Sequence, residues 1–274
     1  MRAALRVLGI EASTGGVGVA LLGAGPDGDV VEARPGPARP AGSLLAVLVS
    51  ILEREGLSLR HLDGLAVAVG PGSYAGVRAA VATGKALAWA AALPLAAVGS
   101  LEAEAWAAMG AWTGAARTGL VVPGTERGVP PQPCLVASAL EARRQRVYGA
   151  VYEVQGGRLV TRAAPALLFR ARWRELVVEA AGRWVEGAAG LCVLAGPGWL
   201  PEEVGAMRGA VEARGVRVAL PLAGGSEHEA AVPLAVAQLG AYQLQAGQAV
   251  DPLRLAPLYI SEPDIGAPPP SAMG

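Results

Sequence analysis

Apolar runs separated by polar turns predict strands and helices in close succession from the start of the chain. Two apolar runs, Val7–Ile10 and Val17–Leu22, flank a short polar turn at Glu11–Gly16, which predicts a β-hairpin. A third strand is expected near Val30–Ala33, followed by a helix over Ser43–Glu55 that begins at a serine cap. The chain therefore opens with an antiparallel hairpin and then a helix.

A glycine turn joins the next strand and helix. The apolar run Leu65–Val69 leads into the turn Gly70–Arg78, and an alanine-rich helix is expected over Ser73–Ala92. Glycines let the backbone approach a ligand closely, and the first N–H groups of a helix can bind an anion. The glycine spacing fits neither the dinucleotide fingerprint nor the P-loop. The turn therefore predicts either a phosphate site or only a tight strand-to-helix connection.

Both predicted helices have unusual faces. The helix over Ser43–Glu55 has scarcely any polar side in its first two turns, and a helix that is apolar all round is buried on every side. The helix over Ser73–Ala92 carries small residues at steps of four, which allow close approach of another helix. These small residues are Gly76, Ala80, Gly84 and Ala88. The two helices either lie inside a large domain or dock another subunit.

The rest of the chain repeats this plan. A strand at Leu93–Val98 and a helix over Ser100–Met109 precede the stretch Gly110–Pro133, whose composition predicts a linker or long loop. Later segments predict strands at Cys134–Leu140, Val147–Tyr152, Arg158–Thr161 and Leu191–Ala195, and a helix over Ala230–Gln245.

The two halves share a further feature. Each contains a Gly-x-Gly turn after an apolar strand, which suggests a duplicated α/β plan with a cleft between the halves. Glu11, Gly70–Ser73 and Gly196–Gly198 are expected to face that cleft.

Composition narrows the class of protein. The chain has 274 residues, 53% of them hydrophobic, which suffices for one large or two modest domains. Lys+Arg and Asp+Glu are equal at 23 each, so no basic excess indicates independent nucleic-acid binding. Cys134 and Cys192 form no Cys-x-x-Cys pair, which favours a reduced, cytoplasmic setting. Neither a signal peptide nor a membrane span is expected.

Residues suited to catalysis or metal binding are scarce. His61 and His228 are the only histidines and lie far apart in sequence, so no histidine pair has metal-ligand spacing. The chain also lacks the Gly-x-Ser-x-Gly elbow of a serine nucleophile. The carboxylates of Glu202 and Glu203 fall at an expected helix start, where they favour the helix dipole. We therefore expect no catalytic residue and no metal site.

Several segments together resemble one known family. The dense matches are Val7–Thr14, Gly70–Arg78, Ala82–Ala88 and Pro94–Glu102, and the sparser ones are Glu141–Tyr148, Gly196–Trp199 and Ala256–Ile260. On these residues the chain resembles TsaB, the non-catalytic partner subunit in bacterial synthesis of threonylcarbamoyladenosine on tRNA.

The resemblance implies a two-domain actin-like ATPase (ribonuclease H-like) fold, with duplicated halves and a cleft between them. The expected divisions are an N-terminal actin-like domain with the partner-binding helices at 1–110, a linker or inserted loop at 111–133, a C-terminal actin-like domain at 134–262 and a disordered tail at 263–274.

The resemblance also implies a scaffold or activator role. A catalytic TsaD-like paralogue transfers the threonylcarbamoyl group to the adenosine 3′ of the anticodon, and TsaB pairs with it through its first two helices. The expected partner-binding residues are Leu44, Leu45, Leu48, Ile51, Leu52, Tyr74, Val77, Arg78, Val81 and Lys85. Further implied partners are a small TsaE-like ATPase, tRNA through the complex only, and a second copy of the chain when it is alone.

The resemblance implies no cofactor for this chain alone. Any ATP or ADP is expected to bind at the level of the complex. The residues expected to hold a nucleotide or phosphate on this chain are Glu11, Ser13, Gly70, Gly72 and Ser73. Glu11 stands where the family usually has Asp, and its longer arm would shift any magnesium or nucleotide contact. The alternative function is a small-molecule kinase or ATPase of the same superfold, using Glu11 and the two glycine turns on phosphates.

Overall fold

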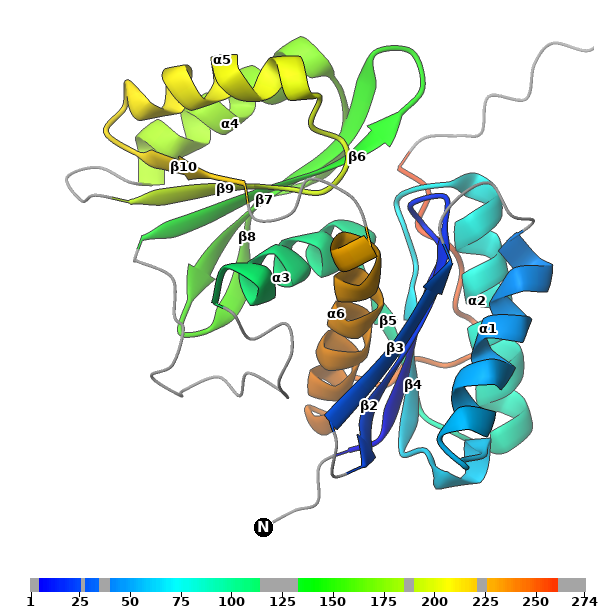
Figure 1. Ribbon diagram of the computed structural model, residues 1–274. Helices are drawn as coiled ribbons and strands as arrows, with labels where there is room; N and C mark the ends of the chain where they lie inside the picture. Colours follow the sequence, from blue (N-terminus) through cyan, green and yellow to red (C-terminus); the bar gives the residue numbers. More distant parts are fainter. Residues whose placement is uncertain are drawn as a thin grey trace, which may run out of the picture.

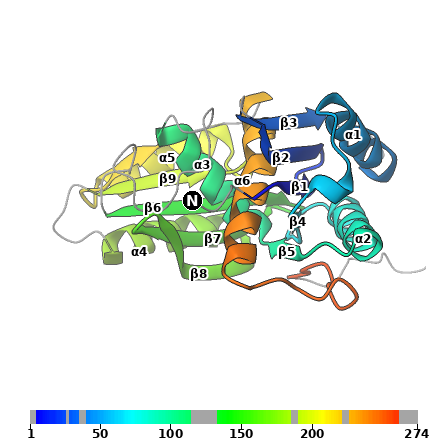
Figure 2. The ribbon, with the colours of Figure 1, turned by 90° about the horizontal axis from the view of Figure 1, so that it is seen from below.

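The structure is a computed structural model that describes residues 5–25, 28–34, 40–113, 133–184, 190–220 and 226–260. Within these residues, two five-stranded sheets are separated by a pair of helices, and further helices cover the outer face of each sheet (Figures 1 and 2).

The first sheet has the strand order β3-β2-β1-β4-β5. Its strands are β1 (Val7–Glu11), β2 (Val17–Gly25), β3 (Gly28–Arg34), β4 (Gly64–Ala68) and β5 (Leu95–Val98). β1 pairs antiparallel with β2 and parallel with β4, so the predicted hairpin is confirmed. Helices α1 (Pro40–Arg54) and α2 (Tyr74–Ala91) cover its outer face, and a short turn of 3-10 helix, η1 (Leu59–His61), precedes β4 (Figure 1).

The second sheet repeats this arrangement with the order β10-β9-β6-β7-β8. Its strands are β6 (Cys134–Ala142), β7 (Arg146–Gln155), β8 (Arg158–Phe169), β9 (Leu191–Ala195) and β10 (Arg217–Ala219). An antiparallel β6-β7-β8 meander is again followed by strands that run parallel to its first strand. Helices α4 (Arg170–Trp184) and α5 (Pro201–Glu212) cover the outer face. The duplicated plan is confirmed, and it is that of the actin-like ATPase fold.

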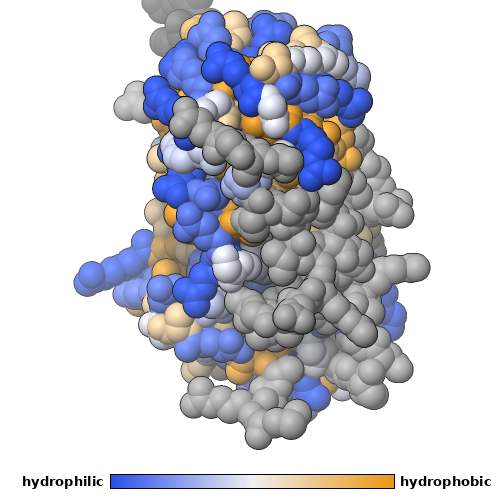
Figure 3. All heavy atoms as spheres, turned by 90° about the vertical axis from the view of Figure 1, so that its left-hand side faces the viewer, coloured by the Kyte–Doolittle hydropathy of each residue, from blue (hydrophilic) through white to orange (hydrophobic). Residues whose placement is uncertain are grey.

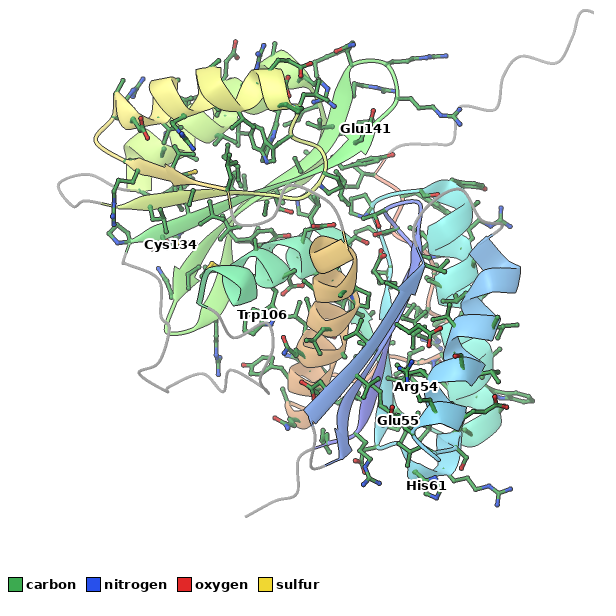
Figure 4. The ribbon with its side chains drawn as sticks, in the orientation of Figure 1. Arg54, Glu55, His61, Trp106, Cys134 and Glu141 are labelled. Carbon is green, nitrogen blue, oxygen red and sulfur yellow. The ribbon has the colours of Figure 1, made fainter. Side chains whose placement is uncertain are left out.

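The two remaining helices lie between the sheets. Helix α6 (Ser226–Gln245) packs on β1, β2 and β4 of the first sheet, whereas α3 (Ser100–Thr113) packs on α6 and on β6 of the second sheet. The indole Nε1 of Trp106 on α3 donates to Gln238 Oε1 on α6 at 2.8 Å (Figure 4 labels Trp106). Each half thus receives a helix from the other half's sequence, and the division into domains at 1–110 and 134–262 stays a prediction.

Close contact between α6 and the first sheet depends on glycine. A Cβ atom at Gly9 of β1 would lie 2.6 Å from the Ala237 backbone nitrogen and 2.7 Å from the Pro233 carbonyl oxygen. At Gly240, on the other side of the contact, a Cβ would meet the Cβ of Ala66. The helix backbone therefore rests directly on the strand, which extends the core of the first half.

Several predicted boundaries differ from the structure. Helix α1 begins at Pro40 rather than Ser43. Proline is favourable in the first helical turn, because the N–H that it lacks would have no hydrogen-bond partner there. β8 continues to Phe169, well beyond the predicted strand over 158–161. Helix α3 extends to Thr113, and the rest of the predicted linker, like the predicted tail from residue 263, lies outside the described residues.

Candidate functional site

A cleft of about 750 Å³ opens between the two halves. Its walls come from the β1-β2 turn, the glycine turn before α2, the β6-β7 hairpin, the turn after β9 and the segment after α6. The lining residues are Ser13, Thr14, Gly15, Pro71, Gly72, Ser73, Tyr74, Val77, Leu140, Glu141, Ala142, Arg143, Arg146, Tyr148, Leu167, Pro197, Leu258, Tyr259 and Ile260. The volume is within the range of ligand-binding clefts, about 300–1,000 Å³.

The glycine turn lines this cleft, but its N–H groups form hydrogen bonds within the chain. The Ser73 N–H donates to the Ser13 carbonyl at 2.7 Å, and the Gly70 N–H donates to the Ser100 hydroxyl at 3.1 Å. The Ser73 hydroxyl accepts from the Gly76 N–H at 3.4 Å and so caps α2. Gly72 has φ +155°, and a Cβ there would meet the Ser13 backbone. These contacts favour the tight strand-to-helix connection, and a phosphate at Gly70, Gly72 or Ser73 stays a prediction.

Glu11 is buried next to the cleft and is not among the residues that line it. Its side chain is 3% exposed, and its Oε1 accepts hydrogen bonds from both the N–H and the hydroxyl of Ser13. The Thr14 hydroxyl donates to its Oε2 at 3.4 Å. Burial raises the pKa of Glu11 above its ordinary value of 4.5, and repulsion from Glu104 adds to this, against the lowering effect of the Ser13 hydrogen bonds. Glu11 therefore shapes its own turn, and the described residues that line the cleft do not include it.

The second glycine turn, Gly196–Gly198, is bonded to a buried ion pair. Arg170 Nη1 donates to Glu203 Oε2 at 2.8 Å and to the Gly198 carbonyl at 2.9 Å. The Trp199 indole donates to the Ala137 carbonyl at 3.1 Å. Glu203 therefore pairs with Arg170 in addition to its expected place in the first turn of α5. This network fixes Pro197 at the edge of the cleft.

The segment after α6, residues 250–260, crosses the first half to the cleft; we call it the strap (the orange-red segment in Figure 2). The Val250 N–H donates to the Leu95 carbonyl at 2.8 Å, and the Leu258 N–H donates to the Val69 carbonyl at 2.7 Å. Lys85 Nζ donates to the Leu255 carbonyl at 2.6 Å and to the Leu253 carbonyl at 3.3 Å. The sequence pattern does not predict this segment as a wall of the cleft, although its residues Ala256–Ile260 are among those that resemble the family.

Most of the predicted partner-binding side chains are buried in the first half. Those with little or no exposure are Leu44, Leu48, Ile51, Leu52, Val77 and Val81. They pack in the core beneath α1 and α2, so their predicted contact with a partner stays a prediction. Lys85 holds the strap. The small-residue stripe of α2 faces the sheet, because a Cβ at Gly84 would lie 3.2 Å from the Val67 Cβ.

Other side chains of these helices are exposed, and we call them the outer stripe. On α1, Leu45 is 50% exposed and Val49, one turn on, is 47% exposed. On α2 the stripe follows helical spacing of three and four residues, and its members are Ala75, Arg78, Ala82, Ala86 and Trp89. Tyr74 is also exposed. On a different side of the molecule, hydrophilic side chains are interspersed with small hydrophobic areas (Figure 3). Direct partner contact stays a prediction for Leu45, Tyr74 and Arg78.

The described residues contain no group of three or more His, Cys, Asp or Glu side chains that could hold a metal ion. His61 lies in η1, away from Glu141 at the cleft (Figure 4), and its Nδ1 accepts from the Ser58 N–H at 3.0 Å, as expected of a cap residue. His228 lies in α6, where its side chain is outside the described set.

The two cysteines are buried in the second half. Burial raises the pKa of each thiol, Cys134 and Cys192, to about 12, which leaves both as unreactive core residues. Among the described helices, each is too short or too polar to cross a membrane.

Comparison with known proteins agrees with the resemblance. The model of the family described as TsaD, tRNA N6-adenosine threonylcarbamoyltransferase, matches residues 41–183. The chain is 32% identical over 130 residues to the tRNA threonylcarbamoyladenosine biosynthesis protein TsaB of Bacillus subtilis, covering 47% of this chain and 48% of that protein. It is 31% identical over 151 residues to TsaB of Escherichia coli, covering 54% of this chain and 55% of that protein. The chain thus spans about half the length of the curated relatives it matches.

A solved structure extends the likeness over the whole fold. YeaZ from Pseudomonas aeruginosa is 25% identical and covers 93% of this chain and 99% of its own, with a TM-score of 0.64. Because the family model covers more than half of the 274 residues, the chain belongs to the family described as TsaD, tRNA N6-adenosine threonylcarbamoyltransferase.

Proposed function

We propose that this chain is a non-catalytic subunit in the synthesis of threonylcarbamoyladenosine on tRNA, where it binds and activates a catalytic TsaD-like paralogue. Two relatives carry the name of this pathway, and the family model is that of the transferase itself. The observation that carries the proposal is the outer stripe, in which Leu45, Val49 and Trp89 are 50%, 47% and 72% exposed. Exposed apolar side chains gathered on one face mark an interaction surface.

The form of the stripe suits a helical partner. Its α2 members lie three or four residues apart, so they share one face, and alanines there permit close approach of another helix. The buried residues beneath, Leu44, Leu48 and Val77 among them, hold α1 and α2 at a fixed distance from the sheet. We therefore assign direct contact to the outer stripe and a supporting role to the core residues.

The non-catalytic role is supported by the position of Glu11. A kinase or ATPase of this superfold would aim this carboxylate at the phosphates or at a magnesium ion, whereas here it is 3% exposed and accepts hydrogen bonds from Ser13. We also propose that the protein works in the cytoplasm and that its complex with the paralogue includes a TsaE-like ATPase, binds tRNA and holds any ATP or ADP. When the paralogue is absent, we expect two copies of the chain to associate through the same outer stripe.

Co-expression with the TsaD-like paralogue and size-exclusion chromatography test the proposal. We expect the two chains to co-elute as a stoichiometric pair. Replacing Leu45 and Val49 by Glu places two charges in the stripe without disturbing the core, and we expect at least about 2 kcal/mol of lost affinity, roughly 30-fold in Kd.

The matched control is Phe169→Glu, because Phe169 is a hydrophobic residue with 65% exposure at the end of β8 in the other half. We expect this variant to bind the paralogue like the unaltered chain. If the Leu45 and Val49 variant stays folded and still binds normally, the outer stripe is not the interface. If the unaltered chain forms no complex, the proposed function is wrong.

A further inference from the structure

The β6-β7 hairpin presents arginines at the mouth of the cleft. Arg143 and Arg146 both line the cleft, Arg143 in the turn Arg143–Gln145 that joins the two strands and Arg146 at the start of β7. Arg144 has φ +62° and Gln145 has φ +56°. Left-handed residues other than glycine cost energy and gather at functional sites. The turn therefore places Arg143 and Arg146 at an energetic cost that the proposed function does not explain.

Aromatic residues face these arginines across the mouth. Tyr259 of the strap stacks on Tyr74 of α2 with ring centroids 5.3 Å apart, and it remains 44% exposed. Arg78 Nη1 donates to the Tyr74 hydroxyl at 2.8 Å, and its guanidinium lies 5.1 Å from the centre of that ring. Tyr148 of β7 adds a third phenol ring to the lining. The mouth thus combines guanidinium groups with aromatic faces.

The wall of the cleft formed by the β1-β2 turn and the glycine turn has a different character. The N–H groups of Gly70, Ser13 and Ser73 are already bonded within the chain, so they cannot cradle the phosphates of a free nucleotide. Arginines bind phosphate oxygens, and single-stranded RNA is held by phosphate contacts together with bases stacked on aromatic rings. Among the described residues that line the cleft, Arg143 and Arg146 are the cationic ones and Glu141 is the acidic one, so phosphate contacts fall to the two arginines.

We propose that the mouth of the cleft binds a single-stranded RNA segment, with a base on Tyr259 and backbone phosphates on Arg143 and Arg146. The inference rests on the proposed function, since it names how this subunit contributes to holding tRNA within the complex. The charge balance of the whole chain agrees with a local contact of this kind, which works together with a partner's surface.

The test measures binding of a fluorescent single-stranded RNA oligonucleotide to the complex with the paralogue, by anisotropy over a series of salt concentrations. Replacing Arg143 and Arg146 by Ala should weaken binding and reduce the slope of log affinity against log salt by roughly 0.7 for each arginine. Tyr259→Leu should weaken binding about fivefold to a hundredfold by removing the stacking face, with the salt slope unchanged.

Two control variants match these changes elsewhere. Arg172→Ala removes an exposed arginine on α4 that pairs with Glu175 and Glu179, and Tyr242→Leu removes an exposed tyrosine on α6 that lies beneath Arg158. Both should leave RNA affinity and salt slope unchanged. Equal effects from the cleft variants and these controls would overturn the inference.

Competitors identify the ligand. If ATP or AMP displaces the oligonucleotide as effectively as unlabelled RNA does, the site takes a free nucleotide and the RNA assignment is wrong. Displacement by polyglutamate at the same charge concentration would show only a general anion site and would also overturn it. Co-elution with the paralogue is measured in parallel on each variant. A retained complex with unchanged RNA binding refutes this inference alone, whereas failure of the unaltered chain to pair with the paralogue refutes the proposed function.

Discussion

Glu11 is a buried carboxyl group near a second buried carboxyl group, Glu104. Its pKa is raised in the folded chain, chiefly by burial, so the folded state keeps a proton that the unfolded chain releases. The free energy of unfolding should therefore fall as pH rises from 4.5 through the raised pKa. In Glu11→Gln this titration disappears, and we expect a flatter dependence together with higher stability than the unaltered chain at the alkaline end.

Urea unfolding followed by circular dichroism between pH 4.5 and neutrality measures this effect, starting from the ordinary pKa of the group. Glu53→Gln, which alters an exposed carboxylate on α1, is the control and should keep the original dependence. Identical pH profiles for Glu11→Gln and the unaltered chain would mean that Glu11 titrates alike in the folded and unfolded chains, so that burial does not shift its pKa.

At the scale of elements, the seating of α6 on the first sheet depends on a missing side chain. A methyl group at Gly9 would press on backbone atoms of α6, the Ala237 nitrogen at 2.6 Å and the Pro233 carbonyl oxygen at 2.7 Å, and neither can turn aside as a side chain could. We expect Gly9→Ala to lower the free energy of unfolding by about 1–3 kcal/mol, as overpacking does, and to loosen α6 in hydrogen exchange.

Gly205→Ala is the matched control for that substitution. Gly205 lies within α5, and a Cβ there would meet nothing within 4 Å. Because alanine is a better helix former than glycine, this variant should gain about 0.5–1 kcal/mol. A neutral result at Gly9 would show that α6 can shift outward and that the contact is not set by the strand.

The elements that the sequence predicts best are those with dense apolar runs. β4 and β9 lie within continuous apolar stretches because they are buried on both faces, and they were placed to within a residue or two. The sequence pattern does not predict helix α4, because its buried positions, Trp173, Val177 and Ala180, are separated by arginines and glutamates that obscure the helical period.

Helices α3 and α6 are exchanged between the two halves of the molecule, and the sequence pattern does not predict which sheet each of them packs against. Both helices are rich in small apolar residues on every side, which predicts burial without saying against which sheet. The candidate site, too, can be predicted from the sequence only in part. The two glycine turns could be predicted from local spacing, whereas the internal use of Glu11 and the position of Tyr259 depend on contacts between distant segments.

The strap connects the edge of the first sheet with the mouth of the cleft, and Lys85 holds its middle. Lys85 Nζ donates to the Leu253 and Leu255 carbonyls, and charged hydrogen bonds of this kind contribute about 1.5–3 kcal/mol. Lys85→Met keeps the length of the side chain but removes these bonds. We expect the Leu258 amide, bonded to the Val69 carbonyl, to exchange its hydrogen about tenfold to a hundredfold faster, with little change in global stability.

Hydrogen exchange followed by mass spectrometry on peptides spanning 250–260 measures this loosening, with Arg254→Met as the control. Arg254 carries a comparable positive charge in the strap itself but pairs only with Asp251 at 3.5 Å while 90% exposed, so its removal should leave exchange unchanged. Faster hydrogen exchange confined to the strap in Lys85→Met would show that the Lys85 side chain on α2 keeps this wall of the cleft ordered. The remaining hydrogen bonds would then be too few to hold the strap in place. Unchanged exchange would instead mean that the bonds at Val250 and Leu258 suffice.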